Sequence, residues 1–157
     1  MKFLASSVER LHSQFEAISI LIPKLEDEMI LQRPESGKWS IHENLAHLGR
    51  YHEIFNKRLE RMLYEDQPLF RRYKAEEDPG TELWVKLSTP IVMKNLLQKR
   101  KVIEQRLLQL GPEELSRKGV HPKLGVMPIP LWLEFFLLHE AHHLYTIFWI
   151  LGEFRTK

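Results

Sequence analysis

The sequence predicts an all-α protein, a four-helix bundle formed by residues 1–157 as a single domain. Three observations predict it: four long segments carry apolar residues at helical spacing, no segment alternates apolar and polar residues, and no repeat occurs. A chain of 157 residues can bury roughly two thirds of its unfolded surface without a disulfide or metal staple. Any bound metal is therefore expected to serve function rather than folding.

The first helix is predicted from an N-terminal run of apolar residues spaced three or four positions apart. This spacing predicts one continuous helix of about 25 residues that tolerates a kink at Pro23. Pro34 and Gly37 end it. The residues of its apolar face are Leu4, Val8, Leu11, Phe15, Ile18, Ile22 and Leu25.

The second helix is predicted to open at Ser40, because Glu43 follows three residues later in the capping-box arrangement. It ends near residues 66–68, where a long connection rich in charge, proline and glycine runs to residue 90. Long connections of this kind often border a functional site. The apolar seam of the helix is Ile41, Leu45, Leu48, His52, Phe55, Leu59 and Met62.

Two further helices complete the expected bundle. The third covers residues 91–110 and is ended by Gly111 and Pro112. A second long connection, residues 111–128, is expected to be a loop, and Pro130 opens the fourth helix. The seam of the third helix is Val92, Leu96, Ile103, Leu107 and Leu110.

The fourth helix is apolar on nearly every side over residues 129–151. A membrane span is not expected, because ionisable residues lie near the middle of this segment. A helix that is buried all round needs more cover than three neighbours give, so we expect a homodimer. The ionisable residues are Glu134, His139, Glu140, His142 and His143.

Composition excludes several classes of function. The net charge of +2 and the pI near 8.8 are too mild to indicate a nucleic-acid partner. The N-terminus lacks the apolar core of a signal peptide, so a cytoplasmic location is expected. The chain has no cysteine, and any thiol chemistry would therefore use a small-molecule thiol as co-substrate.

His139 and His143 are the strongest candidates for metal ligands. Residues four apart on a helix have Cβ atoms roughly 5–6 Å from each other, so both imidazoles can reach one ion at about 2.0–2.1 Å. A core histidine with satisfied hydrogen bonds is the competing interpretation. His47 is the best third ligand because it faces inward from the second helix, whereas His42 is interpreted as a solvated terminus and His52 as a core histidine.

The chain resembles the DinB-like family of metal-binding four-helix bundles, a superfamily that includes bacillithiol and mycothiol transferases. The resemblance rests on three groups of residues in order along the chain. It extends over most of the chain. The groups are Trp39-Ser40 with Glu43 and His47-Leu48; Arg117, Gly119, His121-Pro122 and Gly125; and His139 with His142-His143.

The resemblance implies that His47, His139 and His143 bind a divalent metal ion, with zinc or nickel expected. A three-histidine set without a carboxylate leaves positions open for water or substrate, as in catalytic sites. Enzymes of this class transfer or isomerise with low-molecular-weight thiols. Thr146 stands where the family often has a glutamine, which leaves the support of His143 open.

Three other interpretations compete with a thiol S-transferase. His139-Glu140-Ala141-His142-His143 fits the H-E-x-x-H pattern of zinc metallohydrolases, with Glu140 as general base, but too little chain follows to supply a third ligand. A di-iron site would need Glu9 and His12 on the apolar face of the first helix, and they lie off it. The third alternative is a bundle that binds metal without catalysis, as a sensor or a vestige.

Residues around the expected metal are harder to assign. Glu140 is a candidate base, with a solvent-facing charge as the alternative, and His121 could position substrate or bond its own backbone. Arg50 and Tyr51 could meet an anionic substrate or the second nitrogen of a ligand histidine. Trp39 and Trp132 are expected in the core.

Overall fold

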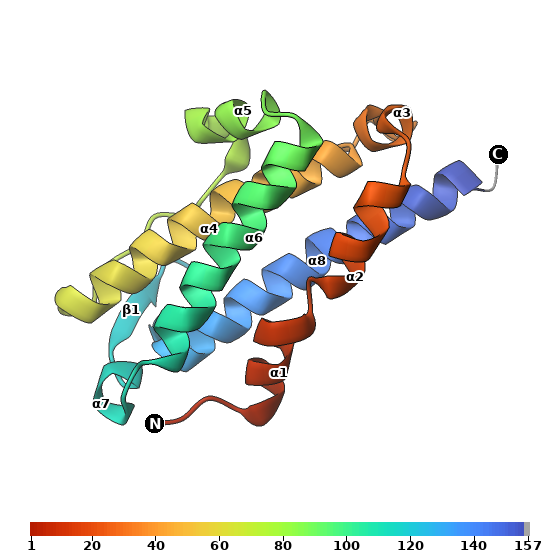
Figure 1. The fold of residues 1–157 in the computed structure, drawn as a ribbon. Coiled ribbons are helices and arrows are strands. Elements are labelled where there is room, and N and C mark those ends of the chain that lie inside the picture. The colour runs from red at the N-terminus through yellow and green to blue at the C-terminus, as the bar shows by residue number, and fades with distance from the viewer. Residues whose placement is uncertain (156–157) are drawn as a thin grey trace.

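The computed structural model describes residues 1–155, and its long helices form the predicted bundle. In Figure 1, α4 (Ile41–Tyr64), α6 (Thr89–Leu108), α8 (Ile129–Arg155) and the N-terminal segment form the four members. Helix α4 contacts both α6 and α8, while α1 (Ala5–Ser13) contacts α8. The all-α prediction is confirmed, except for one small hairpin.

The N-terminal segment is not the single helix that its apolar spacing predicts. It is divided into α1, α2 (Glu16–Leu21), the 3₁₀ turn η1 (Ile22–Lys24) and α3 (Asp27–Leu31). The carbonyls of Arg10 and Leu11, at the end of α1, accept hydrogen bonds from the Arg100 guanidinium. The Arg10 carbonyl also accepts the Gln14 N–H, so α6 replaces a helical donor only at the Leu11 carbonyl, and the helix can end there. Pro23 lies in the second break.

Helix α4 begins as predicted. The Ser40 hydroxyl accepts from the Glu43 N–H at 3.1 Å, and the Ser40 N–H donates to the Glu43 carboxylate at 2.8 Å. This capping box satisfies two N–H groups that the first turn leaves without helical partners. The cap fixes where the helix starts and therefore how far along it His47 lies.

The first long connection is folded onto the bundle. It contains η2 (Ala75–Glu77) and α5 (Pro79–Val85), and α5 packs on α4. The contact requires a glycine on α4, because a Cβ at Gly49 would lie 2.1 Å from the Trp84 ring. This close approach holds the connection beside the histidines of α4.

The second long connection contains a two-stranded antiparallel sheet, which corrects the expected loop. After α7 (Pro112–Leu115), β1 (Lys118–His121) pairs with β2 (Gly125–Pro128), and Gly125 takes a positive φ of 75° in the turn. Strands of four residues are too short to show an alternating pattern. Backbone hydrogen bonds from Val120 to Pro68 and from Phe70 to Val120 tie the hairpin to the first connection.

A buried ion pair ties α8 to the other members of the bundle. Glu140 is 1% exposed and pairs with Arg100 of α6. Its second carboxylate oxygen accepts from Gln14 Nε2 at 2.8 Å, and His52 Nε2 of α4 lies 3.1 Å from the first. One carboxylate thus links α8 to three other chain segments.

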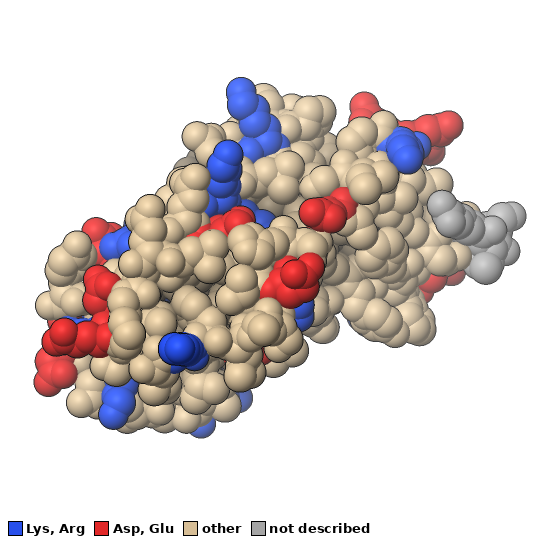
Figure 2. All heavy atoms as spheres, turned by 60° about the horizontal axis from the view of Figure 1, so that its bottom comes forward, with Lys and Arg blue, Asp and Glu red and all other residues tan. Residues whose placement is uncertain are grey.

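Nothing on the surface of the described residues tests the expected homodimer, which stays a prediction. Charges of both signs are interspersed on the face shown in Figure 2. No helix of residues 1–155 is apolar over a length that would cross a membrane. Part of α8 remains uncovered, which a second copy could bury. Its exposed apolar residues are Leu131, Leu138, Tyr145, Phe148 and Trp149.

Removing the buried carboxylate is expected to destabilise the fold. Glu140→Ala leaves the Arg100 charge buried without its partner, and we expect a loss of about 3–5 kcal/mol in the free energy of unfolding. Urea denaturation measures it. Glu65→Ala, which removes an exposed partner of Arg61, should cost no more than about 1 kcal/mol. Equal losses in the two variants would contradict a structural role for Glu140.

Candidate metal centre

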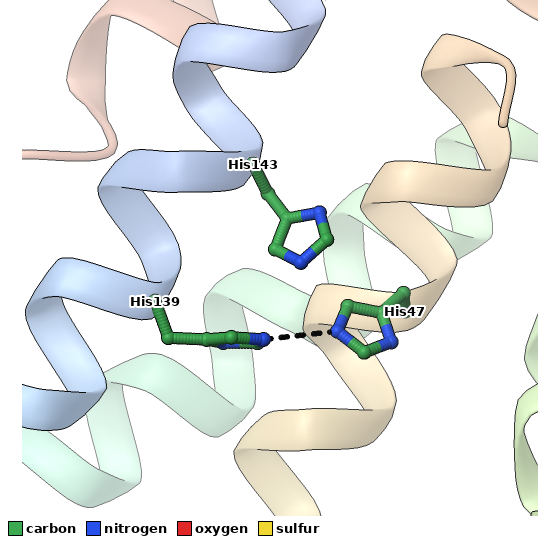
Figure 3. A group of neighbouring side chains, drawn as sticks. All are labelled: His47, His139 and His143. Atoms are coloured by element: carbon green, nitrogen blue, oxygen red, sulfur yellow. Dashed lines mark hydrogen bonds between the residues drawn. The ribbon is translucent and has the colours of Figure 1, made fainter. Parts of the chain in front are cut away.

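Three imidazoles meet between α4 and α8. His47 comes from α4, and His139 and His143 come from successive turns of α8 (Figure 3). One nitrogen from each ring lies within 4.8 Å of the other two, and the Nε2 atoms of His47 and His139 are 3.1 Å apart. The structure therefore brings together the three residues that the sequence analysis selects.

The spacing of these nitrogens fits one metal ion. Two nitrogens bound to a tetrahedral ion at about 2.0–2.1 Å lie roughly 3.3–3.4 Å apart, close to the distance between the His47 and His139 Nε2 atoms. The Nδ1 atoms of both rings are buried without a hydrogen-bond partner among the described residues. An ion held by the Nε2 atoms would not pair with these Nδ1 atoms, so the fit to a metal rests on the spacing of the Nε2 atoms. A divalent ion suits this donor set.

Burial keeps the three imidazoles neutral. Desolvation is the largest cause at each ring: it lowers the pKa of His47 to about 4, of His143 to about 3 and of His139 to about 2. Repulsion between neighbouring imidazolium charges lowers the pKa of His139 and His143 further. Since only a neutral imidazole binds metal, the site is ready for an ion at neutral pH.

Asn44, one turn before His47 on α4, supports His143. The Nδ1–H of His143 donates to Asn44 Oδ1 at 2.8 Å, which leaves Nε2 unprotonated and directed at the other two rings. Thr146 does not take this role, because its hydroxyl donates to the His142 carbonyl at 2.9 Å. The amide that supports the last ligand therefore comes from another helix.

The three histidines open onto a cavity of about 570 Å³, within the usual range for small-molecule sites. Tyr51 packs against His139 with ring centroids 4.0 Å apart and ring planes tilted by 40°, and Trp39 stacks against His143 at 6.1 Å. The remaining lining residues include His121, His142, Phe135, Tyr73, Glu76 and four cations, Arg58, Arg72, Lys74 and Lys123.

Glu140 does not line this cavity. It follows His139 by one residue, about 100° around the helix, and its carboxylate is committed to Arg100. Its burial in this ion pair excludes both expected roles, a base beside the metal and a solvent-facing charge. The H-E-x-x-H interpretation loses its general base for the same reason.

Other candidates divide between cavity and core. His121 lines the cavity, and its Nδ1 also accepts from the backbone N–H groups of Lys123 and Leu124. Trp39 borders the cavity instead of the core, whereas Trp132 is fully buried as expected. Arg50 pairs with Asp78 and Glu53.

Two histidines outside the site are buried. His42 is 4% exposed, so its assignment to a solvated helix end was wrong. Its ring nitrogens each lie 2.9 Å from a partner, one from the Thr89 hydroxyl of α6 and the other from the Val85 carbonyl of α5. His52 is fully buried and lies 2.6 Å from the Leu48 carbonyl through Nδ1, as a core histidine.

Sequence reasoning missed Asn44, Arg58 and Tyr73. Asn44 lies three residues before His47, on the same side of α4, and that spacing was a usable signal. Tyr73 belongs to the first connection, and nothing in the local pattern indicates which way this segment folds. Its ring stacks on His47 at 5.8 Å.

The fold and site define a helical bundle with a three-histidine group that could hold a metal ion. The chain matches the model of the DinB superfamily over residues 7–147 and belongs to that superfamily. No curated protein matches it.

Among solved structures, the chain is similar to YfiT from Bacillus subtilis, with a TM-score of 0.78 and 17% sequence identity. The match covers 95% of this chain and 86% of YfiT. YfiT is described as "a probable metal-dependent hydrolase with an unusual four-helix bundle topology". At this identity the likeness shows the shared fold.

Removing the Asn44 amide is expected to weaken metal binding. Asn44→Ala leaves His143 free to rotate and to carry its proton on either nitrogen, and we expect a loss of about 10–100-fold in Zn²⁺ affinity. Competition with a chelating dye measures it. Thr146→Ala is the matched control and should bind with wild-type affinity. Wild-type affinity in Asn44→Ala would contradict the supporting role.

The metal-free protein is expected to lose stability in mild acid. Below the ordinary histidine pKa of about 6.5, the unfolded chain binds protons that the buried rings, with their lowered pKa values, do not bind. Stability therefore falls as the pH drops from about 6.5 toward 4, by about 2 kcal/mol at pH 5 for one such histidine.

Urea denaturation with EDTA, at about pH 7 and pH 5, measures this difference. In His143→Gln the loss between the two pH values should be smaller, since one of the three titrating rings is absent. An equal loss in both proteins would show that these histidines do not carry the pH dependence.

Proposed function

We propose that the protein is a divalent-metal-dependent enzyme that transfers or activates a low-molecular-weight thiol, as an S-transferase. The observation that carries the proposal is the set of three neutral imidazoles, without a carboxylate, at the wall of a 570 Å³ cavity. Such a set leaves coordination positions for a substrate, as in catalytic sites. Zinc and nickel are the ions that suit imidazole ligands.

The divalent ion would lower the pKa of a thiol or water in the cavity and so supply its deprotonated form near neutral pH. A thiol must come from outside, because the chain has no cysteine. The resemblance to thiol-using bundles favours this co-substrate. The cavity also has room for a second, electrophilic substrate beside the thiol.

Residues of the chain position the substrate. The aromatic rings of Trp39, Tyr51 and Tyr73 surround the histidines and limit the access of water. His121 accepts two backbone N–H groups through Nδ1, so the proton of its neutral ring is on Nε2. We assign to His121 the positioning of a substrate oxygen through this N–H.

Metal-dependent hydrolysis is the second candidate, favoured by the shared fold with YfiT. A divalent ion at the three histidines would lower the pKa of water as it would that of a thiol. A hydrolase would cleave p-nitrophenyl acetate without added thiol, whereas the proposed transferase requires one.

Conjugation of thiols to monochlorobimane tests the proposal. The zinc- or nickel-loaded protein is incubated with glutathione, cysteine, bacillithiol or mycothiol, and the fluorescent conjugate is measured. We expect metal-dependent conjugation with at least one thiol, because the site lowers the thiol pKa.

His47→Ala and His143→Ala should lose both stoichiometric metal and conjugation. His12→Ala, which removes an exposed histidine beside Glu104, should keep both. A protein that binds one ion but conjugates none of the thiols would favour the non-catalytic alternative, a sensor or a vestigial site.

A further inference from the structure

Arg58 is a buried cation in the wall of the cavity. It lies on α4, 8% exposed, and lines the cavity with the three histidines. Its guanidinium donates to the Tyr51 hydroxyl at 3.4 Å and to the Arg71 carbonyl at 3.0 Å. No carboxylate of the described residues is within ion-pair distance of it.

This arrangement leaves the charge of Arg58 incompletely compensated. A guanidinium has five N–H donors, and the protein provides acceptors for two of its nitrogens. The rings of Tyr51, Phe70 and Trp132 lie 5.9, 5.5 and 5.7 Å from its central carbon and fix its position. A buried charge without a counter-ion is costly, and a ligand anion would offset that cost.

Neighbouring groups at this end of the cavity also donate hydrogen bonds. The Nε2–H of His121 is a donor, because Nδ1 is occupied by two backbone N–H groups. The hydroxyl of Tyr51 accepts from Arg58, which leaves its own proton to donate. A carboxylate accepts from such donors without bringing a proton of its own.

The remaining charges of the cavity favour an anion as well. Arg72, Lys74 and Lys123 add three cations to its lining, although Lys74 is paired with Glu77. Among the described lining residues, Glu76 is the one acid, and it also borders the neighbouring hollow beside Trp39. Clefts lined by one sign of charge attract ligands of the opposite sign.

We propose that Arg58, with His121 and Tyr51, binds a carboxylate of the substrate whose reactive group lies at the three histidines. The inference rests on the proposed function and names its substrate class, thiols that carry an acid group. Tyr51 lies between the two subsites, in contact with Arg58 on one side and His139 on the other. One ligand that spans the Tyr51 ring can therefore reach both Arg58 and the three histidines.

Two pairs of probes with the same carbon chain, one ending in a carboxylate and the other in a hydroxyl, test the proposal. The zinc-loaded protein is titrated by calorimetry with 6-mercaptohexanoate and with 6-mercapto-1-hexanol. The metal-free protein is titrated with hexanoate and with 1-hexanol, followed by amide chemical shifts in NMR spectra. We expect the acid of each pair to bind about tenfold tighter or more, as hydrogen bonds to charged groups contribute.

Variants then assign the preference to Arg58. In Arg58→Gln the affinities of acid and alcohol should become equal, and Arg58→Lys, which retains the charge, should keep part of the preference. Arg61→Gln removes a cation from the same helix outside the cavity lining, and it should keep the full preference. Thermal unfolding and zinc stoichiometry establish that each variant is folded and loaded.

Equal binding of acid and alcohol to the wild type would overturn the proposal, and so would a preference that survives in Arg58→Gln. The two arms separate this outcome from a failure of the proposed function. A protein that binds no zinc but prefers hexanoate retains the anion subsite without the metal chemistry. A protein that binds zinc and conjugates thiols without regard to their charge has the metal chemistry but lacks the anion subsite.

Discussion

The buried ion pair between Glu140 and Arg100 is the constraint on which the arrangement of the bundle depends. A carboxylate that is 1% exposed must find its partners, and here they come from α6, α4 and the turn after α1. Because the same guanidinium also donates to the Arg10 and Leu11 carbonyls at the end of α1, one side chain links the break in the N-terminal segment to the rotation of α8.

The rotation of α8 decides what the helix offers on each side. Glu140 faces the core, and so His139 and His143 face α4, where His47 and Asn44 meet them. One face of α8 thus carries a paired charge, and the adjacent face carries two neutral rings with lowered pKa values, which His47 of α4 joins. The separation of these two environments explains why adjacent residues in one motif have different roles.

The connections build the cavity around the histidines. Tyr73 comes from the first connection and His121 from the hairpin in the second, and backbone hydrogen bonds between these segments hold them together. Arg58 and Tyr51 complete the wall from α4. The helices therefore supply the three histidines, and the connections shape the cavity in front of them.

Periodicity and spacing in the sequence determine a large part of this protein. The Ser40 capping box, the seams of α4 and α6, and the pairing of His139 with His143 on one face of α8 follow from local rules, since residues four apart share a helix face. The breaks at residue 14 and near Pro23, the burial of His42, the turning of Glu140 into the core and the support of His143 by Asn44 follow only from the tertiary structure. Each of these depends on a partner distant in the chain, and a local pattern does not contain the position of that partner.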